Sequence, residues 1–504
     1  MQALVERNNR KQHVPLRLHP FLLDVLTTGL TQVAGIAASF VLVGAVSKRM
    51  GVVALGEYLL VRRVSSWLLA ATQLGLGIAL PRQIAQTVHE VETRATQYFL
   101  ATFGVLFVFL TGVGTVMTFN AQRVAHWCFG SENRSLVYAM VLFIFGTAVQ
   151  GTIFGYFRGL ERVQTANLVT FGGTAVVPLL AFGVTHKSQS APVLIGAIGL
   201  GLAVPSILWV IPKGATAWRL CAHLAGDARE LLSYGVARIP GEIALGGLLA
   251  LGPMLVSHYA NMAQNSYLLL GITCLTMASL AFAPVSMVLL ARISRLLATG
   301  RQEDVKEYVG HMRSAVLQLS LGMVVQGLVF ARPIVLWWLG PSCVAGVPVI
   351  CVVMLAIPAY MYFVAMRTVV DAASPVAYNA RNVLITMTVL IALLAAVIRF
   401  VPQESMVIAV AAATTAAICV LALATHRTLR DLKLAERSFQ IGPLWMAGLL
   451  GLISVIAQLG THFQISKLAF GVVMLVNLGL TFLFLRKSQP EWLGFVLRVA
   501  FPRT

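Results

Sequence analysis

The chain has 504 residues, of which 58% are hydrophobic and 11% charged, and its mean hydropathy is +0.84. A net charge of +19 is typical of nucleic-acid-binding proteins, but here most of the basic residues lie in the terminal tails and in short connections between apolar runs, with no soluble basic domain and no aromatic stacking platform. The composition therefore excludes a soluble globular protein and a nucleic-acid partner, and it predicts a bundle of membrane helices.

About fourteen apolar stretches, each long enough to cross a bilayer, follow one another from about Phe21 to Arg486. The first, Val25–Val46, carries no charge, and its 22 residues reach about 33 Å, enough for the hydrocarbon core. Lipid does not tolerate unpaired backbone groups and the runs are too long for barrel strands, so the predicted fold class is an all-α integral membrane protein. We expect helices near 22–46, 57–80, 96–120, 135–157, 166–185, 191–211, 236–258, 265–291, 313–332, 344–366, 382–400, 405–426, 443–461 and 467–485.

The distribution of basic residues predicts the orientation of the chain. The tail before the first helix is basic, and most of the 37 Lys and Arg residues fall on the tail's side of the membrane. The positive-inside rule then places both termini in the cytoplasm. The first apolar run is too long for a signal peptide and no small-residue cleavage pattern follows it, so we expect it to be retained as a helix.

The chain repeats itself at an offset of 209–210 residues, which spans six predicted helices. The matching positions are Tyr58-Leu59-Leu60 with Tyr267-Leu268-Leu269, Arg82 with Arg292, Trp127 and Gly130 with Trp337 and Gly340, Arg158 with Arg367, and Glu161 with Asp371. An even number of helices gives both copies one orientation, which predicts two six-helix lobes related by a pseudo-two-fold along the membrane normal, with a cavity between them. The alternative interpretation is that arginines recur at inner helix ends because of the positive-inside rule alone.

This repeat predicts four parts. They are a cytoplasmic basic tail at 1–20, an N-terminal lobe at 21–212, a C-terminal lobe at 213–437 preceded by a cytoplasmic loop, and two extra helices with a cytoplasmic tail at 438–504.

Several short motifs resemble those of one known family. They are Lys48-Arg49-Met50-Gly51, Gly56-Glu57-Tyr58, Leu74-Gly75-Leu76-Gly77, Pro81-Arg82-Gln83-Ile84-Ala85, Phe157-Arg158-Gly159-Leu160-Glu161 with Ala166-Asn167, Leu232-Ser233-Tyr234-Gly235 and Ala291-Arg292-Ile293-Ser294-Arg295-Leu296. Over nearly its whole length the chain resembles bacterial polysaccharide flippases, the lipid-linked branch of the multidrug/oligosaccharidyl-lipid/polysaccharide exporter superfamily. The pair Arg62-Arg63 departs from the pattern expected there, so its role cannot be carried over.

Arg62 and Arg63 are the strongest candidates for binding an anionic substrate. They are the basic residues placed within a predicted helix, about one turn inside its outer end. Ionisable residues in a membrane usually face a cavity, and a guanidinium binds phosphate through two hydrogen bonds. We expect at least one of them to face the cavity, and because adjacent residues point about 100° apart on a helix, we do not expect both to face the same spot. Snorkelling to the outer interface is the alternative.

Other basic residues are weaker candidates for the same cationic path. Lys48 and Arg49 end the first helix on the outer side, where solvated loop charges are the alternative. Arg238 lies at the start of the seventh helix, beside a Pro-Gly break. The break indicates either a bend that lines the cavity or an ordinary helix start. Arg292 ends the eighth helix, where anchoring at the interface is the alternative.

Energy coupling would require an acid within the membrane. Asp24, Glu57 and Glu242 are the acidic residues near membrane depth, and each is close to a helix end, where a carboxylate is also an ordinary structural feature. The six cysteines show no metal-binding spacing, so we expect no metal and no cofactor. Because so few acidic residues lie near membrane depth, transport driven by membrane potential or by the substrate gradient stays open as an alternative to ion coupling.

The sequence offers no enzymatic motif: no GxSxG, HExxH or Walker A pattern occurs. The resemblance implies a flippase in the bacterial inner membrane that moves undecaprenyl-diphosphate-linked repeat units of O-antigen, exopolysaccharide or capsule by alternating access. Its partners would be lipid-linked oligosaccharide, membrane lipid and other polysaccharide-assembly proteins. The alternatives are a drug/cation antiporter or a peptidoglycan-precursor flippase of the same superfamily, and, in another class, a polytopic glycan polymerase or scaffold.

Overall fold

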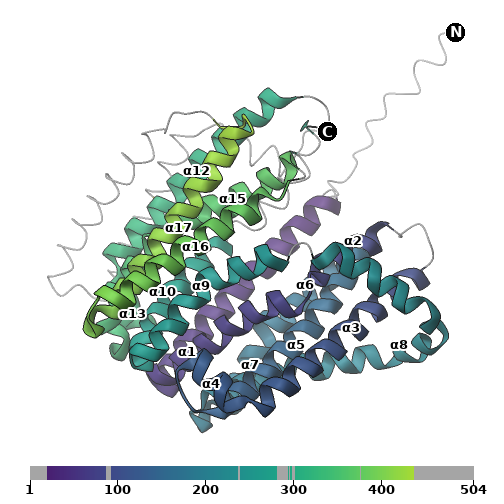
Figure 1. Ribbon diagram of the computed structural model, residues 1–504, viewed down its shortest axis with the longest axis horizontal. Coiled ribbons are helices and arrows are strands. Elements are labelled where there is room, and N and C mark those ends of the chain that lie inside the picture. The colour runs from purple at the N-terminus through teal and green to yellow at the C-terminus, as the bar shows by residue number, and fades with distance from the viewer. Residues whose placement is uncertain are drawn as a thin grey trace, which may run out of the picture.

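The computed structural model describes residues 20–86, 92–236, 239–280, 293, 296–297, 301–374, 376–435 and 479. Within those ranges the chain forms helices and turns and no strand (Figure 1). The first group, here called the N-lobe, contains α1 (Pro20–Thr72), α2 (Leu76–Gln86), α3 (Glu92–Phe119), α4 (Ala121–Phe129), α5 (Arg134–Gly159), α6 (Val163–Phe171), the π-helical turn η2 (Gly172–Val176), α7 (Val177–Thr185), η3 (His186–Ser188) and α8 (Ala191–Val236). The second, here called the C-lobe, contains α9 (Ile239–Tyr259), α10 (Met262–Leu280), α12 (Gln302–Val329), α13 (Ala331–Trp338), η4 (Pro341–Gly346), α14 (Val347–Met354), α15 (Ile357–Ala373), α16 (Tyr378–Phe400), η5 (Gln403–Ser405) and α17 (Met406–Asp431).

The described residues contain nine helices long and apolar enough to cross a membrane, or ten if the bent pair α14–α15 forms one span. The predicted all-α, multi-pass fold is therefore confirmed. The eighth predicted helix is described as far as Leu280, and the thirteenth and fourteenth lie outside the described residues.

Helix α1 contains two spans. Its apolar part, Thr27–Thr72, has 46 residues and would measure about 69 Å if straight, more than twice the hydrocarbon thickness. The chain breaks at Gly51, whose φ of 88° and ψ of 171° are non-helical and favour glycine. The halves on either side of Gly51 are the first and second predicted helices.

The second predicted helix, 57–80, has different bounds in the structure. It starts directly after Gly51 and ends at Thr72, because Leu74 and Gly75 both have positive φ, 52° and 70°. Gly75 is also where the chain passes close to another segment, since a Cβ there would lie 2.3 Å from the carbonyl oxygen of Gly235.

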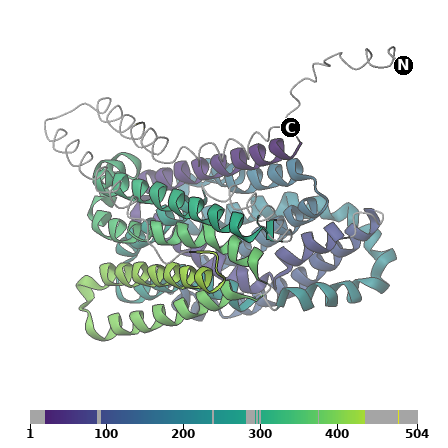
Figure 2. The same cartoon turned by 90° about the horizontal axis from the view of Figure 1, so that it is seen from above.

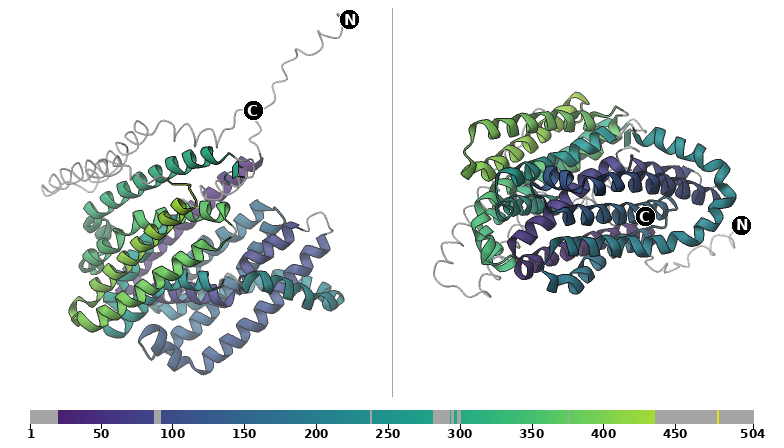
Figure 3. Two further views of the ribbon diagram at one scale, coloured as in Figure 1. Left: turned by 45° about the horizontal axis from the view of Figure 1, so that its top comes forward. Right: turned by 60° about the horizontal axis from the view of Figure 1, so that its bottom comes forward.

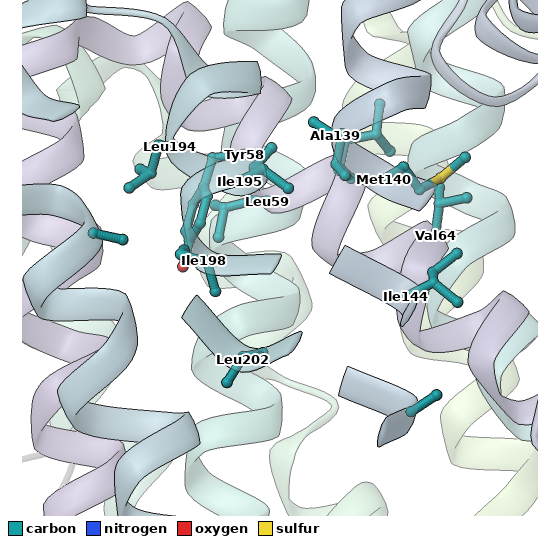
Figure 4. Packing of buried hydrophobic residues seen from close by; sticks show 14 of the residues in the cluster. Tyr58, Leu59, Val64, Ala139, Met140, Ile144, Leu194, Ile195, Ile198 and Leu202 are labelled. Carbon is teal, nitrogen blue, oxygen red and sulfur yellow. The ribbon is translucent and has the colours of Figure 1, made fainter. Parts of the chain in front are cut away.

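Each lobe has a hydrophobic core. One cluster joins the N-lobe helices, and Figure 4 shows Tyr58 of α1 beside Ile195 and Ile198 of α8 within it. A second cluster joins the C-lobe helices around Phe363 and Ile418. Figures 1 and 2 show the lobes side by side with their long helices broadly aligned, and α1 packs along both α9 and α10.

The segment between the lobes is helical and not a loop, whereas its cytoplasmic location stays a prediction. Helix α8 continues beyond Pro212 to Val236 and curves around the edge of the N-lobe (Figure 3, right). Its apolar residues recur at helical spacing, with Leu224, Ala228 and Leu232 packed against the core and Leu231 fully buried. Asp227 adds an ion pair of 3.0 Å with Arg94 at the start of α3.

The helix bounds repeat at the offset that the sequence shows. Helices α3 and α12 begin and end 210 residues apart, and α4 and α13 begin 210 residues apart. The turns after the short helices also correspond, because Gly130 and Gly340 both have positive φ, 61° and 95°. Superposition of whole lobes about one axis stays a prediction.

Candidate functional site

A cavity of about 450 Å³ opens between the N-lobe and α10. Both halves of α1 line it, with Ser39 before the Gly51 break and Arg62 after it, which shows that the halves fold back beside each other. Helices α5, α6, α7 and α8 and the turn η2 complete the N-lobe wall, and α10 contributes Thr273, Thr276 and Met277.

Arg62 and Arg63 both line this cavity. Arg62 lies about eleven residues from the Gly51 break, or roughly 16 Å along the helix, which is near the middle of a 30 Å hydrocarbon core. The sequence placed the pair only one turn from the helix end, because the predicted helix began five residues too late. The sequence led us to expect at least one of the pair at the cavity, and both reach it because the wall formed by α1 runs from Tyr58 through both arginines to Leu69 and is wider than 100° of the helix surface.

Local contacts orient the two guanidinium groups. Arg62 Nη1 donates a 3.1 Å hydrogen bond to the hydroxyl of Tyr58, and its Cζ lies 5.4 Å from the centre of that ring. Arg63 lies within electrostatic range of Arg62 and of the phenol of Tyr360 on α15. Both side chains are half-buried, so neither charge is fully withdrawn from the cavity.

The rest of the wall is uncharged and mixes polar side chains with apolar ones such as Ile36, Phe143 and Leu202. It includes Gln32, Ser39, Ser65, Ser66, Thr147, Gln150, Thr170, Thr174, Thr273 and Thr276, and no acidic residue is among the described residues that line it. The threonine hydroxyls donate to carbonyl oxygens of their own helices, for example Thr147 to Phe143 at 2.7 Å and Thr273 to Leu269 at 2.7 Å. Their oxygens can therefore still accept hydrogen bonds from a ligand. The wall offers cationic donors together with hydroxyl acceptors.

Sequence reasoning missed the part of this wall formed by η2. Gln150 Nε2 donates a 2.7 Å hydrogen bond to the carbonyl of Val169, and a Cβ on Gly173 would lie 1.8 Å from that same amide nitrogen. The amide therefore reaches the backbone only because residue 173 is glycine. A π-helical turn inside a helix often marks a functional site, and the pair Gly172-Gly173 is its signal in the sequence.

The other predicted site residues lie elsewhere. Lys48 and Arg49 are exposed near the Gly51 break, and Lys48 Nζ donates a 2.7 Å hydrogen bond to the carbonyl of Trp337. Asp24, Glu57 and Glu242 are half-buried, and the cavity wall includes none of them. Arg238 and Arg292 lie outside the described residues. The described part of the chain contains no group of His, Cys, Asp and Glu that could hold a metal ion.

The fold is similar to that of known transporters. No protein-family model matches the chain, and no curated protein matches it. Among solved structures, "Lipid II flippase MurJ, inward closed conformation" has a TM-score of 0.71 at 14% identity, covering 94% of this chain and 99% of that one.

Two structures of the Vibrio cholerae MATE transporter VcmN also match, each covering 82% of this chain and 98% of that chain. A point mutant of that transporter has a TM-score of 0.57 at 15% identity, and its bent form has a TM-score of 0.54 at 16% identity. At these identities the similarity shows the fold alone, that of a multi-pass helical membrane protein.

Proposed function

We propose that this protein is a flippase that moves an undecaprenyl-diphosphate-linked oligosaccharide across the bacterial inner membrane by alternating access, and that it is a transporter without enzymatic activity. The observation that supports this function is the cavity, in which Arg62 and Arg63 lie near mid-membrane depth and no described wall residue is acidic. A diphosphate requires positive charge where the dielectric is low, because charge interactions are much stronger there than in water.

The neutral part of the wall suits the glycan. Sugar hydroxyls donate hydrogen bonds, and the threonine oxygens of α5, α6 and α10 accept them. The lipid chain would remain in the bilayer while the head group occupies the cavity. The repeat units would be those of O-antigen, exopolysaccharide or capsule, and other polysaccharide-assembly proteins would supply and receive them.

A peptidoglycan-precursor flippase is the second candidate, favoured by the TM-score of 0.71 to the lipid II flippase. Both candidates share the diphosphate chemistry of the site. A drug/cation antiporter is less well supported, because a cationic drug would face two arginines and no wall carboxylate within the described residues. Nothing in the described part of the chain favours a glycan polymerase or scaffold.

Reconstitution tests the function. Vesicles would first be prepared with an undecaprenyl-diphosphate-linked glycan in both leaflets. An impermeant glycosidase would then remove the glycan from the outer leaflet, and purified protein would be inserted into these vesicles. The protein should then return glycan to the outer leaflet, measured by a second glycosidase treatment. The Arg62→Ala/Arg63→Ala variant should lose at least about a hundredfold in rate, since charge-assisted hydrogen bonds contribute about 1.5–3 kcal/mol each and the variant removes two such donors.

The matched control is Arg49→Ala, which removes an exposed arginine outside the cavity. Equal rates for the double variant and the control would remove the cavity from the mechanism. Parallel vesicles with lipid II or with a repeat-unit lipid distinguish the two flippase candidates. No protein-dependent movement of either lipid would overturn the proposal.

A further inference from the structure

The two lobes also meet away from the cavity, at the end of the bundle that contains the turns at Gly51, Gly130 and Gly340, here called the distal end. There α13 of the C-lobe packs against α1 of the N-lobe. Ser47 Oγ donates a 2.7 Å hydrogen bond to the carbonyl of Leu339, and Lys48 Nζ donates one of 2.7 Å to the carbonyl of Trp337. This set of contacts is the first arm of the distal contact.

An aromatic pair reinforces the first arm. The indole of Trp338 donates a 2.7 Å hydrogen bond to the carbonyl of Phe40, and the two rings stack with centroids 4.1 Å apart and planes 2° apart. Trp338 is also buried against Gly44, where a Cβ would lie 2.8 Å from its ring. The contact is therefore tight and leaves no room between α1 and α13.

The second arm joins α4 of the N-lobe to α9 of the C-lobe. His258 Nε2 hydrogen-bonds at 3.1 Å with the carbonyl of Trp127, and the rings of His126 and His258 meet edge to face with centroids 5.5 Å apart. A Cβ on Gly130 would lie 2.1 Å from the carbonyl oxygen of Ser257, so the two backbones touch.

The two arms occupy equivalent positions of the repeat. Lys48 and His258 are 210 residues apart, and so are Trp337 and Trp127, the residues whose carbonyls they bind. In each arm a side chain at the end of a lobe's first helix reaches the main-chain carbonyl of a tryptophan on the other lobe's short helix. In one contact the N-lobe supplies the side chain and the C-lobe the carbonyl, and in the other these roles are exchanged. Because both contacts share the offset of 210 residues, we attribute them to the internal repeat.

We propose that these arms form a latch that closes the cavity at the distal end, and that both arms must separate for the cavity to open there. The latch rests on the alternating access of the proposed function and not on the identity of the substrate. Opening requires α13 to leave α1 and α4 to leave α9, because both contacts join the lobes at this end. The first arm holds more strongly, with three hydrogen bonds and a stacked ring pair against one hydrogen bond in the second.

The latch can be locked by a single substitution. Cys343 Sγ lies 3.3 Å from Ser47 Oγ, so Ser47→Cys would place two thiols on opposite lobes within reach of a disulfide. Diamide would oxidise the pair: the two thiols form the S–S bond, and diamide accepts their two electrons and two protons. A reductant would restore both thiols.

Opening is measured by a reporter in the cavity, Thr147→Cys, labelled with an impermeant maleimide from the distal side of sealed vesicles and quantified by mass spectrometry of its peptide. Labelling of Glu132→Cys, an exposed position beside Gly130, identifies that side. In the Ser47→Cys protein, diamide should lower reporter labelling at least tenfold, and reductant should restore it. Ser47→Ala treated in the same way is the control and should show no change.

Breaking the latch should have the opposite effect. Lys48→Ala/His258→Ala should raise distal labelling of the reporter at least threefold. The matched control is Gln403→Ala, which removes a 2.6 Å hydrogen bond to the carbonyl of Tyr259 at the same end but within the C-lobe. Failure of Ser47→Cys to form the disulfide, or labelling that neither the lock nor the double variant changes, would overturn the latch. Either result would leave the glycan assay to be judged separately.

Discussion

The internal repeat is preserved in the contacts of the distal end, whereas its two copies differ at the centre of the membrane. At the distal end both copies keep the same device, since Lys48 and His258 bind equivalent tryptophan carbonyls. At the centre the copies have diverged. The positions 209 residues after Arg62 and Arg63 are Gly271 and Ile272, which are uncharged. Gly271 packs so closely that a Cβ would lie 2.8 Å from Val353.

This difference indicates which parts of the molecule hold it together and which act on a substrate. The contact that closes the two lobes recurs on both sides of the repeat in the hydrogen bonds of Lys48 and His258. A binding site is needed only once. The N-lobe opens a cavity around its arginines, whereas the C-lobe fills the equivalent place with packed side chains.

The glycines of the two arms test the symmetry with the largest expected effect. Gly130→Ala adds left-handed strain of about 1–2 kcal/mol and forces its Cβ into a backbone carbonyl on the other lobe, a further cost of about 1–3 kcal/mol. Gly340→Ala meets only Lys48 Cγ at 3.8 Å, so it strains its own turn by about 1–3 kcal/mol. Thermal unfolding in detergent should show the larger loss for Gly130→Ala.

The Gly130→Ala and Gly340→Ala variants also distinguish local backbone strain from opening of the lobes at the distal end. Gly130→Ala should also raise distal labelling of a Thr147→Cys reporter, because its clash lies between α4 and α9. Gly340→Ala should leave that labelling unchanged. Equal labelling of the two variants would show that the second arm does not hold the lobes.

At the centre, charge alone should not replace the arginines. Arg62→Lys/Arg63→Lys keeps both charges but loses the planar fork that binds phosphate through two hydrogen bonds. We expect glycan translocation to fall about tenfold, close to 1.4 kcal/mol, and to remain well above that of the double alanine variant. Arg49→Lys, an exposed exchange outside the cavity, should have no effect. A rate equal to wild type would mean that only the field of the arginines matters.

The sequence predicted the fold well because bilayer thickness imposes a clear length on every apolar run. It also identified Arg62 and Arg63, since a charge inside such a run is costly and therefore conspicuous. It did not find the cavity wall, because Thr147, Gln150 and Thr273 are ordinary residues of apolar helices and only packing brings them together. The break in the second helix was missed for a similar reason: Leu74 and Gly75 have positive φ where the chain passes close to Gly235, a contact distant in sequence.

Helix α8, which forms the segment between the lobes, is attached to the N-lobe. Tyr98 on α3 donates a 2.9 Å hydrogen bond to Glu230 and accepts one of 3.2 Å from Arg94, so α8 is fixed to the N-lobe. Tyr98→Phe removes both bonds and should lower stability by about 1–2 kcal/mol, seen as a lower midpoint of thermal unfolding. Tyr259→Phe, at the other end of the protein, is the control, since Gln403 binds its main-chain carbonyl and not its hydroxyl. An unchanged midpoint for Tyr98→Phe would show that the apolar face of α8 holds it alone.

We expect the smallest effect, a modest fall in translocation rate, from Thr273, where α10 of the C-lobe lines the cavity. Thr273 on α10 directly follows Ile272, the equivalent of Arg63, and its hydroxyl donates to its own helix at Leu269. Thr273→Val keeps the shape but removes an oxygen that can accept a sugar hydroxyl. A neutral hydrogen bond contributes about 0.5–1.5 kcal/mol, so translocation should fall about threefold, with protein levels unchanged. Thr388→Val, whose hydroxyl makes the same kind of bond on the exposed face of α16, should not alter the rate. A fall as large as that of the arginine variants would mean that the two lobes share the binding site equally, and the contrast between a symmetric end and an asymmetric centre would no longer hold.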